Sequence, residues 1–213
     1  MRTIAIALLV CLVSSQTLTA AELLLFRGSF APIKVEEGVS LDKSFTVQLI
    51  RDGERTAWTL AESGRGGWPW PERFGTDGSP ALLYDRGDGF STVPLPAFFA
   101  DEPNLANGSQ WQQAGLTYRV VGEEKAKDTD AWQVLASDPY GPKRRLLVAK
   151  DDRRIIKIDD RVFVGQGTEC KLQWELIEHK TLETDVAVAA LRDFDALVAL
   201  RSKLELSPRT RET

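Results

Sequence analysis

The chain has 213 residues, with 27 Lys or Arg against 31 Asp or Glu, so its formal net charge is −4. This acidic balance argues against a general nucleic-acid binder, and the length fits one domain with a substantial hydrophobic core. The single histidine, His179, excludes multi-histidine metal sites, and the sequence contains no phosphate-binding loop or nucleophile motif. We therefore predict no catalytic residue, no metal and no cofactor.

Residues 1–21 have the features of a secretory signal peptide. Arg2 provides a positive charge, Ile4–Val13 is an apolar run of 10 residues, and Thr19 and Ala21 suit the −3 and −1 positions of a cleavage site. A membrane-spanning helix needs roughly 20 apolar residues, so we expect cleavage after Ala21 and no remaining transmembrane anchor. The mature protein is predicted to be periplasmic or secreted, with 26 basic against 31 acidic residues and a net charge of −5.

Ten short segments with strand-like alternation are expected in residues 22–180. Their close spacing favours antiparallel hairpins over crossover connections, and their single apolar face is typical of a sheet with one wet side. The predicted fold is mainly β with one C-terminal helix (α+β), a ten-stranded antiparallel meander forming a curved sheet, half-barrel or sandwich. The expected strands are Ser44–Ile50, Thr56–Leu60, Ala81–Tyr84, Phe90–Leu95, Leu116–Val121, Ala131–Ala136, Arg145–Ala149, Arg154–Ile158, Arg161–Gly165 and Glu169–Glu178.

The cysteine pattern excludes an internal disulfide in the mature protein. Cys11 leaves with the leader, so Cys170 remains alone. In a strand, Cys170 shares a face with Leu172 and Trp174, which predicts a buried structural thiol rather than a reactive one.

Residues 181–207 contain the one expected helix, Asp185–Leu206, whose apolar residues recur at helical spacing. Thr184 or Asp185 can cap its start, and Pro208 ends it. We expect this amphipathic helix to pack on the apolar face of the sheet; the alternative is a contact helix for a partner chain. Residues 208–213 are predicted to be a disordered tail.

Charged clusters offer few candidates for chemistry. Three acidic pairs, Glu123-Glu124, Asp151-Asp152 and Asp159-Asp160, fall in expected turns, where local backbone bonding favours Asp. The basic run Lys143–Arg145 is likewise interpreted as a solvated turn. Spacing alone does not exclude a carboxylate pair of the glycosidase type.

The segment Gly64–Gly78 is rich in glycine, proline and tryptophan and is expected to be a long loop. Trp68 and Trp70 flank a proline that restricts their orientation, and Phe74 follows. These three aromatic residues are weak candidates for ligand binding, as a platform for a sugar or another flat ligand. The competing interpretation is a loop that folds back as a lid over the core.

A further comparison rests on the segments Leu82–Gly89, Ala131–Leu135, Asp138–Gly141, Arg144–Val148, Val162–Gly167 and Cys170–Leu176, with the loop Trp68–Phe74. These segments resemble exported proteins of planctomycete-type bacteria, in which a similar β-rich region precedes a thioredoxin-like domain. The resemblance covers roughly Trp58 to Leu176, transfers no site residue, and implies that this chain is the β-rich module alone. The strand order also resembles, more loosely, the periplasmic lipoprotein-carrier (LolA-like) fold, which implies a curved antiparallel sheet with an apolar cavity.

These patterns favour an exported, non-catalytic binding or interaction module of the cell envelope. It would hold an apolar ligand or a protein partner on the concave face of its sheet. The alternatives are a carboxylate-dependent hydrolase acting on carbohydrate, and a structural accessory subunit of an envelope complex that makes contact through the Asp185–Leu206 helix.

Overall fold

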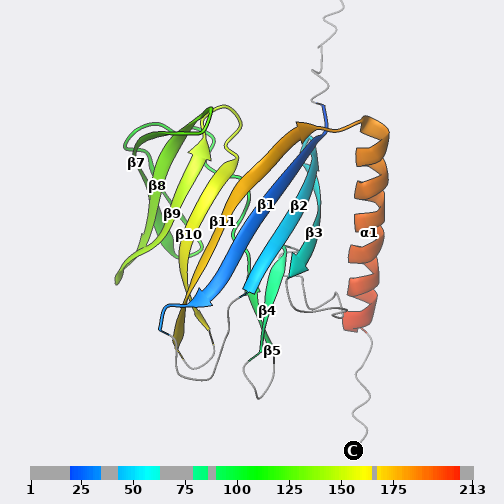
Figure 1. Ribbon diagram of the computed structural model, residues 1–213, viewed down its shortest axis with the longest axis horizontal. Coiled ribbons are helices and arrows are strands. Elements are labelled where there is room, and N and C mark those ends of the chain that lie inside the picture. The colour runs from blue at the N-terminus through cyan, green and yellow to red at the C-terminus, as the bar shows by residue number, and fades with distance from the viewer. Residues whose placement is uncertain (1–19, 35–42, 63–78, 86–89, 165–166, 207–213) are drawn as a thin grey trace, which may run out of the picture.

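The computed structural model describes residues 20–34, 43–62, 79–85, 90–164 and 167–206. Nine strands form one antiparallel sheet in the order β3-β2-β1-β11-β10-β9-β8-β7-β6, and β4 and β5 form a separate hairpin (Figure 1). The predicted fold class is confirmed: the sheet is antiparallel, open at its β3 and β6 edges, and followed by one helix. The strands are β1 (Glu22–Pro32), β2 (Lys43–Asp52), β3 (Arg55–Glu62), β4 (Ala81–Asp85), β5 (Phe90–Pro94), β6 (Gln110–Gln113), β7 (Leu116–Ala126), β8 (Thr129–Asp138), β9 (Gly141–Ala149), β10 (Ile155–Val164) and β11 (Thr168–Thr181).

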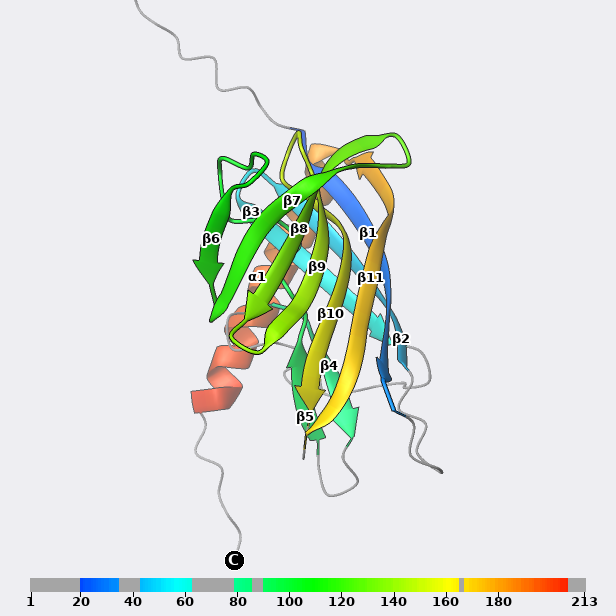
Figure 2. The same cartoon turned by 90° about the vertical axis from the view of Figure 1, so that its left-hand side faces the viewer.

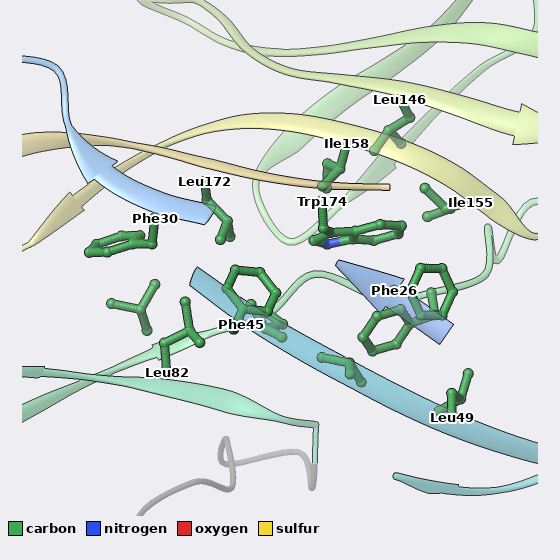
Figure 3. Packing of buried hydrophobic residues seen from close by; sticks show 14 of the residues in the cluster. Phe26, Phe30, Phe45, Leu49, Leu82, Leu146, Ile155, Ile158, Leu172 and Trp174 are labelled. Carbon is green, nitrogen blue, oxygen red and sulfur yellow. The ribbon is translucent and has the colours of Figure 1, made fainter. Parts of the chain in front are cut away.

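The sheet is curved, and its concave face holds the main core. In Figure 2, β7, β8 and β9 pass in front of β2 and β3. The β4–β5 hairpin and the segment 95–100 cover this face and contribute Leu82, Val93 and Phe98 to the core. Three rings meet there: the Phe26 centroid lies 4.7 Å from that of Phe98 and 4.9 Å from that of Trp174. Figure 3 shows Phe26 and Trp174 beside each other in this layer.

Strand β1 was not among the predicted strands, although it lies near the middle of the sheet, between β2 and β11. Its apolar run Leu23–Phe26 does not alternate with polar residues, because both faces of the strand are covered. Leu24 and Phe26 are buried in the main core, whereas Leu23 packs against a second cluster on the opposite face. A strand covered on both faces lacks the alternating pattern by which half-exposed strands are found.

Gly28 in β1 allows two layers to approach closely. A Cβ atom at this position would lie 2.1 Å from Cζ of Phe45 and 2.6 Å from the carbonyl oxygen of Gln173. The Phe45 ring therefore occupies the space that any other residue's side chain would need.

The prediction of two strands at Arg154–Ile158 and Arg161–Gly165 was wrong. They form one strand, β10, so Asp159 and Asp160 lie in the middle of a strand rather than in a turn. Glu123 and Glu124 likewise lie within β7. Acidic doublets can occupy a strand when one of the two residues faces solvent and the other has a partner across the sheet.

Helix α1 (Thr184–Leu206) lies on the face opposite the main core. Neighbouring residues of a strand point to opposite faces, so Leu49 of β2 joins the main core while Ile50 packs against Ala187 of the helix. Leu191 is also buried, whereas Val186, Val188 and most of the C-terminal half of α1 are exposed. The helix therefore packs mainly on β2 and β3, on the face opposite the main core, rather than on the main apolar face of the sheet.

The predicted cleavage position falls on a packed residue. Ala21 is buried with Ile50 and Ala187, and its carbonyl oxygen accepts a hydrogen bond of 2.7 Å from the backbone N–H of Leu182. Cleavage after Ala21 would remove these contacts from the mature protein. Residues 1–19 and the tail 208–213 lie outside the described residues, so the signal peptide and the disordered tail stay predictions.

Candidate functional site

The three aromatic residues proposed from the sequence as ligand contacts, Trp68, Trp70 and Phe74, lie outside the described residues. Both interpretations, a lid over the core and a platform for a ligand, stay predictions. The described residues contain a different candidate, which begins with a buried ion pair.

Asp160 of β10 and Arg144 of β9 are direct cross-strand partners on the concave face. Both Nη2 and Nε of Arg144 donate to Oδ2 of Asp160, at 2.7 and 3.0 Å, and Nη1 donates to the hydroxyl oxygen of Tyr118 at 2.9 Å. Asp160 is only 2% exposed. The interpretation of Lys143–Arg145 as a solvated turn was therefore wrong: the whole run lies within β9, and Arg144 belongs to a buried network.

Burial raises the pKa of the Asp160 carboxyl, and attraction to the Arg144 guanidinium opposes this rise. Desolvation is the larger effect because the carboxylate has little access to water. Buried ion pairs of this kind contribute little net stability, since the desolvation of two charges offsets their attraction. The pair therefore fixes the positions of Arg144 and Tyr118 more than it stabilises the fold.

An open cleft of about 590 Å³ lies directly beside this network. It is formed where β8 turns into β9 and where β10 ends, with the start of β7 as a further wall. Apolar, aromatic and charged side chains all contribute to it. The lining residues are Leu116, Asp138, Tyr140, Lys143, Arg144, Asp160, Arg161, Val162 and Phe163.

Two aromatic residues at the cleft are unusually exposed. Tyr140, in the β8–β9 turn, is 93% exposed, and Phe163, near the end of β10, is 58% exposed. Val162 and Leu116 line the same cleft and connect it to the main core. Large apolar surface left in water at a concave site is typical of a binding surface.

The charged groups at the cleft are held in place by short contacts. Oδ1 of Asp138 accepts a hydrogen bond of 2.8 Å from the backbone N–H of Tyr140, and Oδ2 lies 3.6 Å from Nζ of Lys143. Nζ of Lys143 also lies 4.8 Å from the centroid of the Phe163 ring, a cation–π distance. Three cations against two carboxylates leave the lining with one excess positive charge.

A signal for this site was present in the sequence. Asp160 stands between Ile158 and Val162, at a position where the alternation of β10 predicts an apolar residue. Arg144 breaks the pattern of β9 in the same way, two residues before Leu146. Only strand pairing shows that the two breaks are opposite each other.

A second polar cluster lies at the other end of the concave face. Arg154 is buried, and its Nη1 lies 2.6 Å from Oδ2 of Asp152 and 3.4 Å from Nε2 of His179. The same Nε2 lies 3.4 Å from Oε1 of Glu22. His179 is exposed. This cluster ties the β9–β10 turn to β1 and β11.

Within the described ranges, no group of three or more His, Cys, Asp and Glu side chains could hold a metal ion. No helix in that part of the chain is long and apolar enough to cross a membrane.

Neither a family model nor a curated protein matches the chain. Among solved structures, a DUF1329 family protein from Desulfovibrio piger matches at 11% identity and a TM-score of 0.26, over 76% of this chain and 85% of that one. A LolA superfamily protein from Nitrosomonas europaea matches at 9% identity and a TM-score of 0.24, over 77% and 87%. The expected similarity to the lipoprotein-carrier fold is met only in this loose form, and the planctomycete resemblance is not tested. TM-scores this low do not establish a shared fold, so the function proposed below rests on the sequence of residues 1–21 for export and on the described residues for binding.

Proposed function

We propose that the protein is an exported, non-catalytic binding module of the cell envelope that holds an apolar ligand in the cleft at the β8–β9 turn. The observation that carries this proposal is the exposure of Tyr140 and Phe163 at a concave site that contains a fixed polar network. Its volume of about 590 Å³ lies within the range of roughly 300–1,000 Å³ for small-molecule sites.

The free energy of burying apolar surface favours binding of an apolar ligand in the cleft. Burial of apolar surface contributes about 25 cal/mol per Å², and a fully buried aromatic side chain contributes roughly 1.5–3 kcal/mol. A ligand that covers Tyr140 and Phe163 gains this contribution without rearrangement of the sheet. The wider concave face is already filled by the β4–β5 hairpin and segment 95–100, so the ligand site lies at the end of that face rather than across it.

The polar groups of the cleft support binding better than catalysis. Asp160 is paired with Arg144, and Asp138 accepts from a backbone N–H and faces Lys143. The described lining contains no Ser, Thr or Cys side chain that a base could activate as a nucleophile. A hydrolase is the second candidate function, because Asp138 and Asp160 line one cleft and burial raises the pKa of Asp160, as a general acid requires.

Export rests on the sequence of residues 1–21. Expression of the full chain and of a chain without these residues, followed by cell fractionation, tests it. We expect the full chain in the periplasm or medium, shortened at its N-terminus, and the deleted chain in the cytoplasm. The same location for both would contradict export.

Ligand binding is tested by titration with N-phenyl-1-naphthylamine, an uncharged apolar probe whose fluorescence rises on burial. We expect saturable binding by the wild-type protein and weaker binding by Phe163→Ala and Tyr140→Ala. The matched control is Val188→Ala, which removes a 51% exposed apolar side chain from the helix, outside the cleft. If the probe binds all four proteins with equal affinity, the cleft is excluded as its binding site.

The hydrolase candidate predicts release of reducing sugar from a panel of polysaccharides by the wild-type protein and none by Asp160→Asn. Release that disappears in this variant would overturn the non-catalytic proposal.

A further inference from the structure

We propose that the ligand is an amphiphile with a single negative charge on its head, a carboxylate or a phosphodiester, and that Lys143 binds this charge. The inference rests on the proposed function, because it names the chemistry of the ligand for the same cleft.

Lys143 is the cation of the cleft that lies beside the exposed Phe163 ring, and its ion pair with Asp138, at 3.6 Å, leaves its ammonium donors open to a further anion. Arg144 donates three hydrogen bonds, two to Asp160 and one to Tyr118. Arg161 lies 3.5 Å from Glu169 and is largely exposed. The Lys143 ammonium has three donors, and among the described residues its nearest carboxylate oxygen lies 3.6 Å away, beyond hydrogen-bond distance.

Arg144 provides a second donor beside Lys143. A guanidinium has five N–H groups, and the contacts to Asp160 and Tyr118 use three of them. The two that remain are on Nη1 and Nη2, and the Arg144 side chain keeps 21% of its surface exposed. The buried ion pair holds this donor in a fixed direction, so little side-chain entropy is lost when an anion binds.

The carboxylates of the cleft limit how much negative charge it accepts. The lining contains three cations and two carboxylates, and Arg161 is paired with Glu169 outside the lining, so a singly charged head relies on the remaining donors of Lys143 and Arg144. A second negative charge would approach Asp138 or Asp160 and be repelled. A cationic head would meet Lys143 and Arg144 and be repelled in the same way.

The apolar part of the ligand has a defined place next to this head. The Phe163 ring lies 4.8 Å from the Lys143 ammonium, so a head bound there puts the adjoining chain on the ring. Val162 and Leu116 line the rest of the cleft and extend the apolar surface toward the core.

The test is displacement of N-phenyl-1-naphthylamine by four compounds with the same dodecanoyl or dodecyl chain. These are dodecanoate, dodecanoyl lysophosphatidylglycerol, uncharged monododecanoylglycerol and dodecylamine. Since a hydrogen bond to a charged group contributes roughly a factor of ten or more in affinity, we expect the better anion to displace the probe at about tenfold lower concentration than the uncharged compound. Whichever anion, dodecanoate or dodecanoyl lysophosphatidylglycerol, has the higher affinity identifies the head as a carboxylate or a phosphodiester.

Lys143→Gln should bring the affinity ratio of anionic to uncharged compound close to one, and Lys143→Arg should retain most of it. The matched control, Lys171→Gln, removes a cation that pairs with Asp159, outside the cleft, and should keep the wild-type ratio. Equal displacement by anionic and uncharged compounds, or preference for dodecylamine, would overturn the inference while leaving the proposed function intact. Failure of the probe to bind at all would instead overturn the proposed function.

Discussion

Removal of Arg144 should leave Asp160 as an uncompensated buried charge, and this prediction tests the electrostatics of the cleft directly. In Arg144→Met, the apolar stem is kept while the guanidinium and its contacts to Asp160 and Tyr118 are lost. Breaking one side of a buried ion pair costs roughly 3–5 kcal/mol. Because the Arg144 side chain is partly exposed, water can reach the site after the substitution, so we expect a loss near 3 kcal/mol.

The double variant Arg144→Met with Asp160→Leu separates this effect from loss of packing. Replacement of both charges by apolar groups removes the desolvation penalty together with the attraction, so we expect its stability to lie within about 1 kcal/mol of the wild type. Urea unfolding, with the slope m checked for constancy, measures all three proteins. A double variant no more stable than Arg144→Met would refute the reasoning.

The pH dependence has a defined sign. Burial raises the pKa of Asp160 above its value in the unfolded chain, and removal of Arg144 raises it further, because the opposing attraction is lost. A raised carboxyl pKa means that the folded state binds the proton more tightly, so stability falls as the pH rises through the interval between the two values. The loss of stability of Arg144→Met relative to the wild type should therefore be small in acid and grow toward neutral pH. An equal loss of stability in acid and at neutral pH would contradict this.

Three further outcomes are expected. Gly28→Ala should destabilise the protein by about 3 kcal/mol through overpacking, whereas Gly122→Ala, whose added carbon meets nothing closer than 3.6 Å, should have little effect in urea unfolding. The Cys170 thiol is buried and its pKa is raised to about 11, so it should react with a thiol reagent only on unfolding; fast labelling of the native protein would be the contrary result. A chain that begins at Glu22 should be less stable than one that begins at Ala21 by about 1–2 kcal/mol, measured by thermal unfolding, because Ala21 packs on the helix and accepts a backbone hydrogen bond.

Local sequence pattern predicted most of the strands because each half-exposed strand carries its own alternating signature. It failed at β1, where Leu23 faces the helix side and Leu24 the main core, so that the run Leu23–Phe26 contains no polar residue, although Arg27 and Ser29 are exposed farther along the strand. It failed again in β10, where Asp159 and Asp160 had the composition of a turn. In both cases the deciding contacts come from segments far away in the chain.

The candidate site was less predictable than the fold. The cleft takes Leu116 from β7, Tyr140 from a turn, Lys143 from β9 and Phe163 from β10, and no single segment contains a recognisable motif. Trp68, Trp70 and Phe74 were candidates because the composition of Gly64–Gly78 is unusual over a short window. A cleft assembled from ordinary residues gives no such local signal.

The sequence by itself determined the antiparallel class, the C-terminal helix and the buried thiol of Cys170, because hydrophobic periodicity and cysteine count act locally. The tertiary structure alone decided that the helix covers β2 and β3 on the face opposite the core, and that Arg144 meets Asp160. Periodicity says which residues share a face but not which strands are neighbours. Burial, ion pairing and the cleft depend on that neighbourhood, so they emerge only when the chain has folded.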